Sequence, residues 1–501
     1  MDSGLQAYSW VNGEYSIRSE DDPLAKLIPI INPATEELIA KIEITSSEAV
    51  HDIVSKSLHA FKTGRWPRAD PSERFAVLSK AAGMMRERMH DFIRYEAMQT
   101  GRPIREMRAQ LARIPEWLEY FASLARTMEG RVTPFKGPVV NTLTRSPLGV
   151  VAQITPWNHP LLIATKKMAA ALAAGNCVIV KPSELAPLSV LTMGKIFQAA
   201  GLPDGALQII TGTGPETGKY LCQDRRLAKI DLTGGLGTYR AIAPAASQNL
   251  ISITAELGGK APVCIFESMT VGRAVQAALF ASFIASGQTC VTGSRILAHD
   301  KIYDEFIALL VERTKKLRIG DPTLDDTQIG AVINKAAVER CTKFVAEAVN
   351  EGGKLLCGGS PTTVSGKGFF FHPTLIETSA TSSLSCNEVF GPVIAIIRCT
   401  SEEDIIDIAN STKYALGASV WTDDFAQAHR VAEKIEAGIV WINGHHLNDP
   451  SSPWGGFKES GVGKENGIEA YESYTKVKST IINYGVLPTW FDEDVGTSRY
   501  G

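Results

Sequence analysis

The chain lacks the sequence features of a disulfide-rich, membrane-spanning or nucleic-acid-binding protein. Its eight cysteines include no CxxC pair and show no regular spacing, which argues against a disulfide framework and a zinc site. The richest apolar stretch, MAAALAAGNCVIV, is interrupted by Gly-Asn and is far shorter than the roughly 20 residues of a membrane-spanning helix. A net charge of −3 provides no basic surface for nucleic acid and no polybasic membrane anchor.

The first residues, MDSGLQAYSWVNGEYSIRSEDD, are polar and acidic and lack the charged-then-apolar order of a secretory signal. Together with the isolated cysteines, this predicts a reducing, cytoplasmic location. With 501 residues, of which 44% are hydrophobic, the chain is expected to be a globular protein of about two or three domains.

Strand-like and helix-like segments alternate from residue 149 to residue 256. Runs rich in Ile and Val, such as GVVAQI, CVIVKP and AKIDLT, are typical of buried strands, and stretches such as LLIATKKMAAALAAG have helical spacing and Gly stops. Because this rhythm is typical of parallel strands joined by helices, it predicts a doubly wound α/β fold. A second α/β series follows LGGKAP, so we expect a domain boundary near Gly258–Gly259.

Two β-prone segments lie outside this rhythm, at residues 126–149 and 476–493. Both alternate apolar and polar residues without an intervening helix. Because exposed strand edges seek partners, we expect these segments to pair with each other or with a neighbouring subunit. A homodimer or homotetramer is therefore predicted.

Three short motifs that suggest nucleotide or metal binding are better explained as ordinary loops. In GTGPETG, residues 212–218, the third Gly comes one position too late for a dinucleotide-binding loop. In ESGVGKEN, Glu465 stands where a phosphate loop has the Ser or Thr that holds magnesium. The neighbouring side chains of His445 and His446 diverge, and no carboxylate lies at ligand spacing. No metal site is predicted.

Cys290 lies in SGQTCVTGSR, among small, polar and Gly residues, whereas a cysteine that only packs is expected among apolar neighbours, like Cys177. A thiolate attacks carbonyl carbon readily, and the attack creates an oxyanion that needs donors. Asn158, between two prolines in TPWNHP, offers an amide donor directly after a predicted strand. Glu256, in ITAELGGK, offers a base at the carboxyl end of another strand, where α/β sheets gather ligands.

Together these segments resemble the NAD(P)-dependent aldehyde dehydrogenases. TPWNHP, ALAAGNCVIVKPSE, LPDGALQIITG, ITAELGGKAP, SGQTCVTGSR, NEVFGPV, YALGASVWT and WGGFKESGVGKENG occur in the family's order and spacing over essentially the whole chain. The resemblance implies an α/β protein with the aldehyde dehydrogenase fold. Its parts are a Rossmann-like dinucleotide-binding domain (1–126 and 147–257), an α/β catalytic domain (258–458) and a β oligomerisation arm (127–146 and 474–501).

A hydrolytic mechanism is implied by the same resemblance. Cys290 is the nucleophile, and Asn158 forms the oxyanion hole with the backbone N–H of Cys290. Glu256 activates the water that hydrolyses the thioester, a task suited to a carboxylate whose pKa burial raises. Lys167 and Glu465 match positions that line a proton route to that glutamate.

For the cofactor, Lys181 and Glu184 in KPSE match residues that hold the adenosine ribose. A carboxylate there accepts both ribose hydroxyls and repels a 2′-phosphate, so NAD is expected, with NADP as the alternative. Glu388 and Phe390 match the residues at the nicotinamide ribose and beside the nicotinamide. The remaining cofactor positions implied by the resemblance are Ile154, Thr155, Trp157, Ser183, Gly214, Thr233, Gly234, Gly235 and Leu257.

The pyrophosphate turn departs from the family pattern. Gly235 stands where the family usually has Ser, and Tyr239 stands where it has another Gly. Backbone N–H groups at a helix start are then left to bind the phosphates.

The substrate pocket is predicted to disfavour a quaternary ammonium. Trp454 matches the betaine and amino-aldehyde branch, whose aromatic residues surround a cation. Lys166 and Ile284 replace two further aromatic residues of that branch, and the Lys166 ammonium would repel a cation unless it is a surface lysine. We therefore expect a neutral or anionic aldehyde, such as a semialdehyde or an aromatic aldehyde. The remaining pocket positions are Arg113, Trp117, His159, Thr289 and Val291.

Three alternatives stay open: a betaine or amino-aldehyde dehydrogenase, a CoA-acylating aldehyde dehydrogenase, and a non-catalytic scaffold of the same fold. Glu256 argues against the acylating enzyme, which has no need of a deacylating base at this position. The joint presence of Cys290, Asn158 and Glu256 argues against a scaffold.

Overall fold

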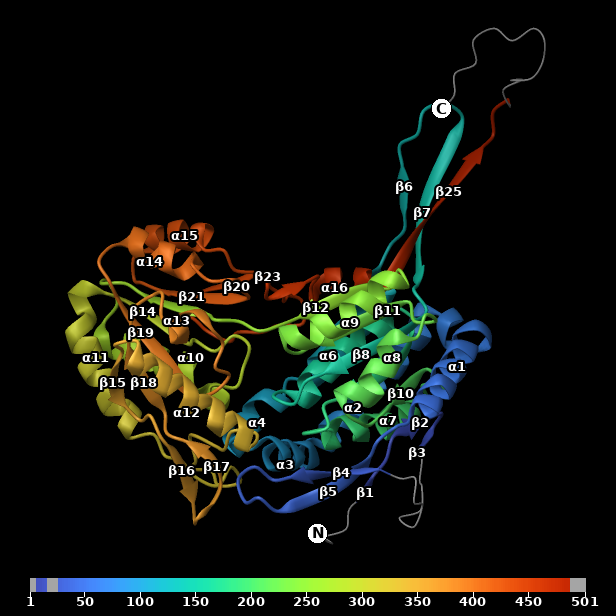
Figure 1. The fold of residues 1–501 in the computed structure, drawn as a ribbon. Helices are drawn as coiled ribbons and strands as arrows, with labels where there is room; N and C mark the ends of the chain where they lie inside the picture. The colour runs from blue at the N-terminus through green and yellow to red at the C-terminus, as the bar shows by residue number, and fades with distance from the viewer. Residues whose placement is uncertain (1–5, 16–25, 487–501) are drawn as a thin grey trace.

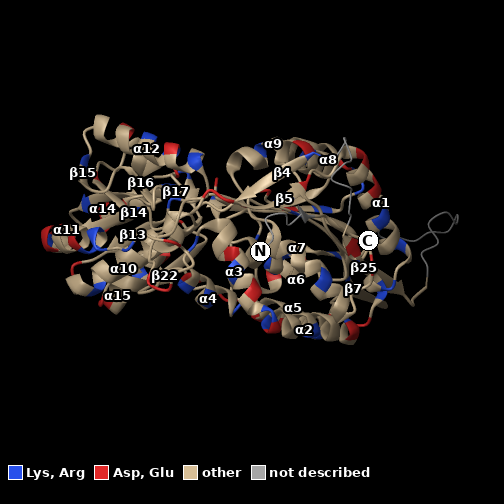
Figure 2. Ribbon diagram, turned by 90° about the horizontal axis from the view of Figure 1, so that it is seen from below, with Lys and Arg blue, Asp and Glu red and all other residues tan. Residues whose placement is uncertain are grey.

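The computed structural model describes residues 6–15 and 26–486. Two α/β bodies lie side by side, and a long β arm projects from one of them (Figure 1). Lysines and arginines are interspersed with acidic residues over the helices of both bodies, so no face seen in Figure 2 carries charge of one sign. Within the described residues, no helix is both long and apolar enough to cross a membrane.

The first body is built on an eight-stranded sheet. Its five central strands run parallel, and the strands at both edges are antiparallel to their neighbours. From edge to edge the strands are β24 (Gly461–Val462), β12 (Ser252–Glu256), β11 (Lys229–Thr233), β8 (Val150–Thr155), β9 (Cys177–Pro182), β10 (Leu207–Ile209), β2 (Trp10–Val11) and β3 (Glu14–Tyr15).

Helices cover both faces of this sheet. They are α1 (Ser47–Thr63), α2 (Pro71–Glu87), α3 (Met89–Thr100), α4 (Ile104–Leu111), α5 (Pro115–Thr127), α6 (Pro160–Ala173), α7 (Leu188–Ala200), α8 (Lys219–Gln223), α9 (Leu236–Gln248) and α16 (Gly467–Ser473). From β8 the chain passes through α6 and α7 to β9 and β10, and then returns to the other side of β8 through α8 and α9. Because parallel crossovers are right-handed, the two helix pairs lie on opposite faces.

The reversal of strand order between β8 and β11 has a functional consequence. Open α/β sheets bind ligands beyond the carboxyl ends of the strands at such a switch point. Those ends are Thr155 and Thr233, so Asn158 and Gly235 follow directly in the loops above the switch point.

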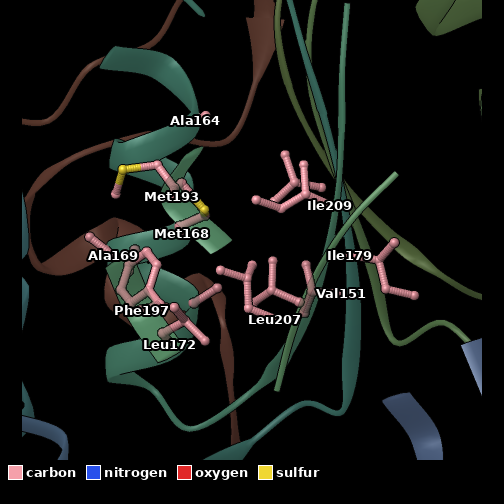
Figure 3. Packing of buried hydrophobic residues seen from close by; sticks show 14 of the residues in the cluster. Val151, Ala164, Met168, Ala169, Leu172, Ile179, Met193, Phe197, Leu207 and Ile209 are labelled. Atoms are coloured by element: carbon pink, nitrogen blue, oxygen red, sulfur yellow. The ribbon is translucent and has the colours of Figure 1, made fainter. Parts of the chain in front are cut away.

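The core beneath this point consists of apolar side chains. Met168 of α6 and Phe197 of α7 point toward Leu207 and Ile209 of β10, while Ile179 of β9 points to the other side of the sheet (Figure 3). Each fully buried side chain of this size contributes about 1.5–3 kcal/mol. Every residue of α6 is buried, because other helices cover the face that points away from the sheet.

The second body has a seven-stranded sheet, parallel except for its first strand. In order the strands are β15 (Lys354–Cys357), β18 (Thr374–Glu377), β19 (Val393–Cys399), β14 (Arg295–His299), β13 (Pro262–Ile265), β21 (Gly417–Trp421) and β22 (Ile439–Ile442). Its helices are α10 (Val271–Phe283), α11 (Asp300–Lys315), α12 (Lys335–Asn350), α13 (Ser383–Cys386), α14 (Glu402–Asn410) and α15 (Phe425–Lys434).

Smaller sheets complete the fold. The arm of Figure 1 is a three-stranded antiparallel sheet of β25 (Thr475–Asn483), β7 (Val139–Pro147) and β6 (Arg131–Thr133). The others combine β1 (Gln6–Ala7), β5 (Leu38–Glu43) and β4 (Leu27–Ile31), β16 (Pro361–Val364) with β17 (Lys367–Phe371), and β20 (Tyr414–Ala415) with β23 (Phe457–Lys458).

The structure confirms the predicted strand and helix rhythm and the doubly wound sheet. The two β-prone segments pair with each other, which is one of the two arrangements expected from the sequence. Residues 487–493 of the second segment lie outside the described part of the chain. The strands on either side of Gly258–Gly259 belong to different sheets. The assignment of domain ranges remains a proposal, and β24 shows that the chain returns to the first sheet after residue 458.

Candidate active site

Cys290 lies in the loop between α10 and β14, at the interface of the two bodies. It is partly exposed, while Thr289 and Val291 on either side are buried. Burial raises the pKa of the Cys290 thiol to about 12, and the carboxylates of Glu256 and Glu388 reinforce the shift. The thiol is therefore protonated at neutral pH and needs a base to become a nucleophile.

The turn before Cys290 is strained. Ala285 and Ser286 have φ values of 53° and 54°, a left-handed conformation that non-glycine residues rarely adopt. The carboxylate of Glu106 accepts a hydrogen bond from the backbone N–H of Ala285 at 3.1 Å. Glu106 is in turn ion-paired with buried Arg102 at 3.2 Å, so a buried pair at the start of α4 supports the strained turn.

Asn158 lies beside the same loop. Its buried carboxamide nitrogen donates to the backbone carbonyl of Gln288 at 2.9 Å, two residues before Cys290. A carboxamide has two N–H groups, so a second donor remains for an oxyanion formed at the sulfur. Arg102 also donates to the backbone carbonyl of Asn158 at 3.4 Å, which joins the two loops.

Glu256 ends β12 as a buried carboxylate. Neither of its oxygens has a hydrogen-bond partner among the described residues. Gly455 packs so closely that a Cβ there would lie 2.6 Å from Oε1 of Glu256. Burial raises the pKa of Glu256 well above its usual value, with Glu465 adding to the shift and Lys167 opposing it. The site thus holds a strong, largely desolvated base.

Lys167 and Glu465 lie next to Glu256 in a buried polar network. The ammonium of Lys167 contacts carboxylate oxygens of both Asp231 and Glu465, and the hydroxyl of Tyr474 donates to Asp231. Burial lowers the pKa of Lys167, but the two carboxylates outweigh burial and raise it. Thr233 donates to Glu465 at 3.0 Å, which links the network to the end of β11.

Asp231 and Tyr474 were not predicted from the sequence. The strand AKIDLT is otherwise buried and apolar, and a charged residue inside such a strand needs a partner charge. This need for a partner charge was the signal by which Asp231 could have been identified from the sequence.

Lys166 is not a surface lysine, so that interpretation is wrong. Its side chain is 4% exposed, and its ammonium lies 2.9 Å from Oε2 of Glu465. The same ammonium lies 5.0 Å from the centre of the Trp454 ring. Burial favours protonation of Glu465, but Lys166 and Lys167 outweigh it and lower the pKa of Glu465 to about 2.

The residues predicted for the adenosine ribose lie together after β9. The buried ammonium of Lys181 contacts Oε2 of Glu184 at 3.3 Å, and Glu184 remains about one-third exposed at 31%. Ser183 caps the turn by accepting from the backbone N–H of Leu185 at 3.3 Å. An accessible carboxylate beside a buried ammonium fits the two hydroxyls of a ribose.

The residues predicted for the nicotinamide half lie near Cys290. Glu388 accepts from the backbone N–H of Gly259 at 2.8 Å, and its carboxylate fills the space that a Cβ at Gly258 would need. Burial raises the pKa of Glu388 to about 7. The rings of Trp157 and Phe390 meet edge to face at 5.4 Å.

The pyrophosphate turn offers free backbone donors. Helix α9 starts after Gly235, which has no side chain that could cap the helix. A Cβ at Gly235 or at Gly214 would meet nothing within 4 Å. Gly234 donates its N–H to the backbone carbonyl of Glu256 at 3.0 Å, which ties this turn to the candidate base. Open space at a helix start fits a diphosphate. Of the other predicted positions, Thr155 and Leu257 are buried and Ile154 is partly buried.

Two residues that were predicted near the pocket mouth make other contacts. Trp117 is a core residue, 2% exposed, and its indole donates to Asn466 at 2.8 Å. Arg113 is exposed but is paired with Glu116 at 2.9 Å and with Asp449 at 3.6 Å. Arg113 therefore presents no free charge.

Other pocket positions do gather around Cys290. Trp454 and Val291 form an apolar cluster with Trp441 and Leu416, against which Cys290 packs. Ile284 caps the end of α10 and is partly exposed.

Histidines contact the residues on both sides of Cys290, an arrangement that was not predicted from the sequence. His445 contacts the carbonyl of Val291 at 2.8 Å, and Nε2 of His446 lies 3.1 Å from the hydroxyl of Thr289. The ring of His159 lies 6.1 Å from that of His446. The side chains of His445 and His446 diverge, so that each imidazole contacts one of the two residues that flank Cys290 in the sequence. No cluster of metal-ligating side chains exists among the described residues.

Residues 19–480 match the sequence model of the Aldehyde dehydrogenase family. The chain belongs to the aldehyde dehydrogenase family. It is similar to "Betaine aldehyde dehydrogenase" of Mesorhizobium japonicum, with 36% identity over 96% of this chain and 98% of that one. It is also similar to "4-trimethylaminobutyraldehyde dehydrogenase" of Oryzias latipes, with 34% identity over 92% of each chain.

Among solved structures, betaine aldehyde dehydrogenase from Staphylococcus aureus in complex with NAD⁺ superimposes with a TM-score of 0.94. The identity is 32%, and 97% of each chain is covered. These comparisons confirm the predicted family and fold class, and the chain is an oxidoreductase that acts on aldehydes. The NAD⁺-bound neighbour agrees with the predicted nicotinamide cofactor.

Proposed function

We propose that the protein oxidises an aldehyde to the carboxylic acid with NAD⁺, through a covalent intermediate on Cys290. The observation that supports this most is the convergence of three groups. The thiol of Cys290, the carboxamide of Asn158 and the unpartnered carboxylate of Glu256 come from different elements and meet at one loop.

The first step forms a bond between sulfur and the aldehyde carbon. Glu256 takes the thiol proton, the sulfur attacks, and the carbonyl electron pair moves onto oxygen. The carboxamide of Asn158 and the backbone N–H of Cys290 donate to that oxyanion. Bound NAD⁺ supplies the acceptor for the hydride that leaves this carbon, and a thioester on Cys290 remains.

The second step hydrolyses the thioester. Glu256, after releasing its first proton to solvent, takes a proton from water as the water oxygen attacks the thioester carbon. The carbon–sulfur bond then breaks, the acid leaves, and Cys290 returns to the thiol. A buried base with a raised pKa serves both proton transfers.

The cofactor is proposed to lie across the switch point. Lys181 and Glu184 would hold the adenosine ribose, the start of α9 the diphosphate, and Glu388 the second ribose. The partly exposed carboxylate of Glu184 would repel a 2′-phosphate, so we propose NAD rather than NADP.

We also propose that the arm forms an interface in a homodimer or homotetramer. The strand β25 is an edge strand with exposed Val477, Ile481 and Ile482. Light scattering of an Ile481→Lys variant should show smaller particles than the native protein. A cytoplasmic location is proposed as well, in keeping with eight free cysteines.

A stopped-flow burst tests the reaction. The native enzyme should turn over steadily. Glu256→Gln should release about one NADH per site more slowly than the native enzyme, because only solvent is left to take the thiol proton, and should then stall, because the thioester is not hydrolysed. Release of acyl-CoA instead of free acid would favour a CoA-acylating enzyme. No burst with any reactive aldehyde would favour a scaffold.

A further inference from the structure

Lys166 is a buried cation that the proposed reaction steps do not use. Its side chain is 4% exposed, and its ammonium lies 2.9 Å from Oε2 of Glu465. The next residue, Lys167, contacts Oε1 of the same carboxylate, and the hydroxyl of Thr233 donates to that oxygen at 3.0 Å. Each oxygen of Glu465 therefore contacts an ammonium group.

The backbone places Glu465 beside the candidate base. Glu465 and Trp454 exchange backbone hydrogen bonds of 2.6 Å and 2.7 Å, and Gly455, which follows Trp454, packs against Oε1 of Glu256. Thr233, which donates to Glu465, is paired with Glu256 across the strands β11 and β12. Glu465 thus lies where a proton that leaves Glu256 could be passed on.

A carboxylate held in this way is a poor proton acceptor. Protonation of Glu465 would leave a buried ammonium without a partner charge, which is strongly unfavourable. Burial alone favours the protonated form, but Lys166 and Lys167 outweigh it and lower the pKa of Glu465 to about 2. Glu465 is therefore a fixed negative charge at neutral pH.

Lys166 also acts on Glu256. The charged and titratable groups that face Glu256 are Glu465, Asp231, Lys166, Lys167, Lys464 and Cys290. Glu465 also faces the buried phenol of Tyr474. Burial raises the pKa of Glu256, and the nearby carboxylates add to the rise, whereas the two lysines of α6 oppose it. Loss of Lys166 would leave an excess of negative charge beside Glu256, and a like charge disfavours ionisation.

Building on the proposed function, we infer that Lys166 is a positioning residue for thioester hydrolysis, which keeps Glu465 as a carboxylate that takes no proton from Glu256 and favours the ionised form of Glu256. Water gives its proton to Glu256 as the water oxygen bonds to the thioester carbon, and Glu256 then releases that proton to solvent. The inference departs from the proton route through Lys167 and Glu465 that the family resemblance implies.

The pH dependence of deacylation in Lys166→Met tests the inference. Rapid-quench sampling measures the pentanoate released in a single turnover, after NAD⁺ and pentanal have formed the acyl-enzyme. The rate rises with pH as Glu256 loses its proton. Removal of a positive charge near Glu256 should move the midpoint of this rise to higher pH by about one pH unit.

Two further variants serve as controls for this shift. Lys166→Arg keeps the charge and should have a midpoint close to that of the native enzyme. Lys316→Met, at a lysine that is 71% exposed, removes the same charge far from Glu256 and should not move the midpoint.

Glu465→Gln tests the proton route with the opposite sign. It removes a negative charge beside Glu256, so the midpoint should move to lower pH. If Glu465 instead received the proton, this variant would leave the proton on Glu256, and the midpoint would move to higher pH. Lys166→Met combined with Glu465→Gln removes one charge of each sign and should return the midpoint toward the native value. If Lys166→Met does not fold, this double variant provides the comparison with Glu465→Gln.

The outcomes separate this inference from the proposed function. A midpoint that does not move in Lys166→Met, or that moves to higher pH in Glu465→Gln, would overturn the inference. Failure of the native enzyme to produce NADH with pentanal or any other aldehyde would instead contradict the proposed function.

Discussion

The ammonium of Lys166 lies 2.9 Å from a carboxylate oxygen of Glu465, although both side chains are more than nine-tenths buried. Glu465 therefore joins two adjacent lysines of α6, and Lys167 continues the network to Asp231. Two ammonium groups and two carboxylates balance in charge. A proton added to or removed from Glu256 therefore changes the net charge of this buried group.

Lys166 is predicted to keep cationic aldehydes out. Lys166→Phe removes the ammonium from the face of Trp454 and adds a second aromatic ring, so kcat/KM for 4-trimethylaminobutanal should rise about tenfold relative to pentanal. Lys166→Met, which removes the charge without adding a ring, should give a smaller rise. Steady-state kinetics on both substrates measure the ratio. An unchanged ratio in Lys166→Phe would show that Lys166 does not determine specificity.

Deacylation is predicted to depend on pH through Glu256. The base acts only when deprotonated, and its pKa is raised, so the rate should increase with pH over a range well above the usual carboxylate value. The negative charge of Asp231 adds to this shift. Asp231→Asn should therefore move the rise to lower pH in single-turnover measurements.

Asp326→Asn, at a carboxylate that is 73% exposed, is the matched control and should leave the profile in place. Asp231→Asn should also lower the free energy of unfolding by about 3 kcal/mol, because it breaks a buried ion pair. A pH profile that does not move would remove Asp231 from the electrostatics of the base.

The pair of Arg102 and Glu106 is predicted to position the nucleophile. Glu106→Ala removes the acceptor for the N–H of Ala285, and a small displacement of Cys290 should lower kcat about a hundredfold. Cofactor binding, measured by fluorescence titration, should persist. Glu106→Gln keeps an acceptor and should recover much of kcat.

A double variant separates positioning from stability. Glu106→Ala leaves the Arg102 charge buried and unpaired, a cost of about 3–5 kcal/mol. Arg102→Met with Glu106→Met removes both charges and should regain stability, while kcat should stay low. Recovery of kcat together with stability would mean that the pair only stabilises the fold.

Local sequence patterns predicted the first sheet and pointed to Cys290. The alternation of Ile- and Val-rich runs with helical stretches predicted the first sheet, and the small residues around Cys290 predicted an unusual cysteine. The contact of Lys166 with Glu465 was not predictable in this way, because it joins segments far apart in the chain. The two lysines inside an otherwise apolar α6 nevertheless signalled that acidic partners must exist.

The pocket residues were the least predictable. Trp117 was expected at the mouth and lies in the core, because its indole finds a partner in Asn466 from a distant loop. His445 and His446 lie in a loop, as predicted, but their contacts with Val291 and Thr289 were not predicted. Such orientations depend on tertiary contacts that a sequence pattern does not encode.

Mass spectrometry of a trapped acyl-enzyme shows whether Cys290 carries the covalent intermediate. Glu256→Gln is mixed with NAD⁺ and pentanal, and the peptide that contains Cys290 is analysed. We expect a mass increase corresponding to one pentanoyl group on Cys290, absent from Cys290→Ser. No adduct despite NADH release, or an adduct on another residue, would contradict the account.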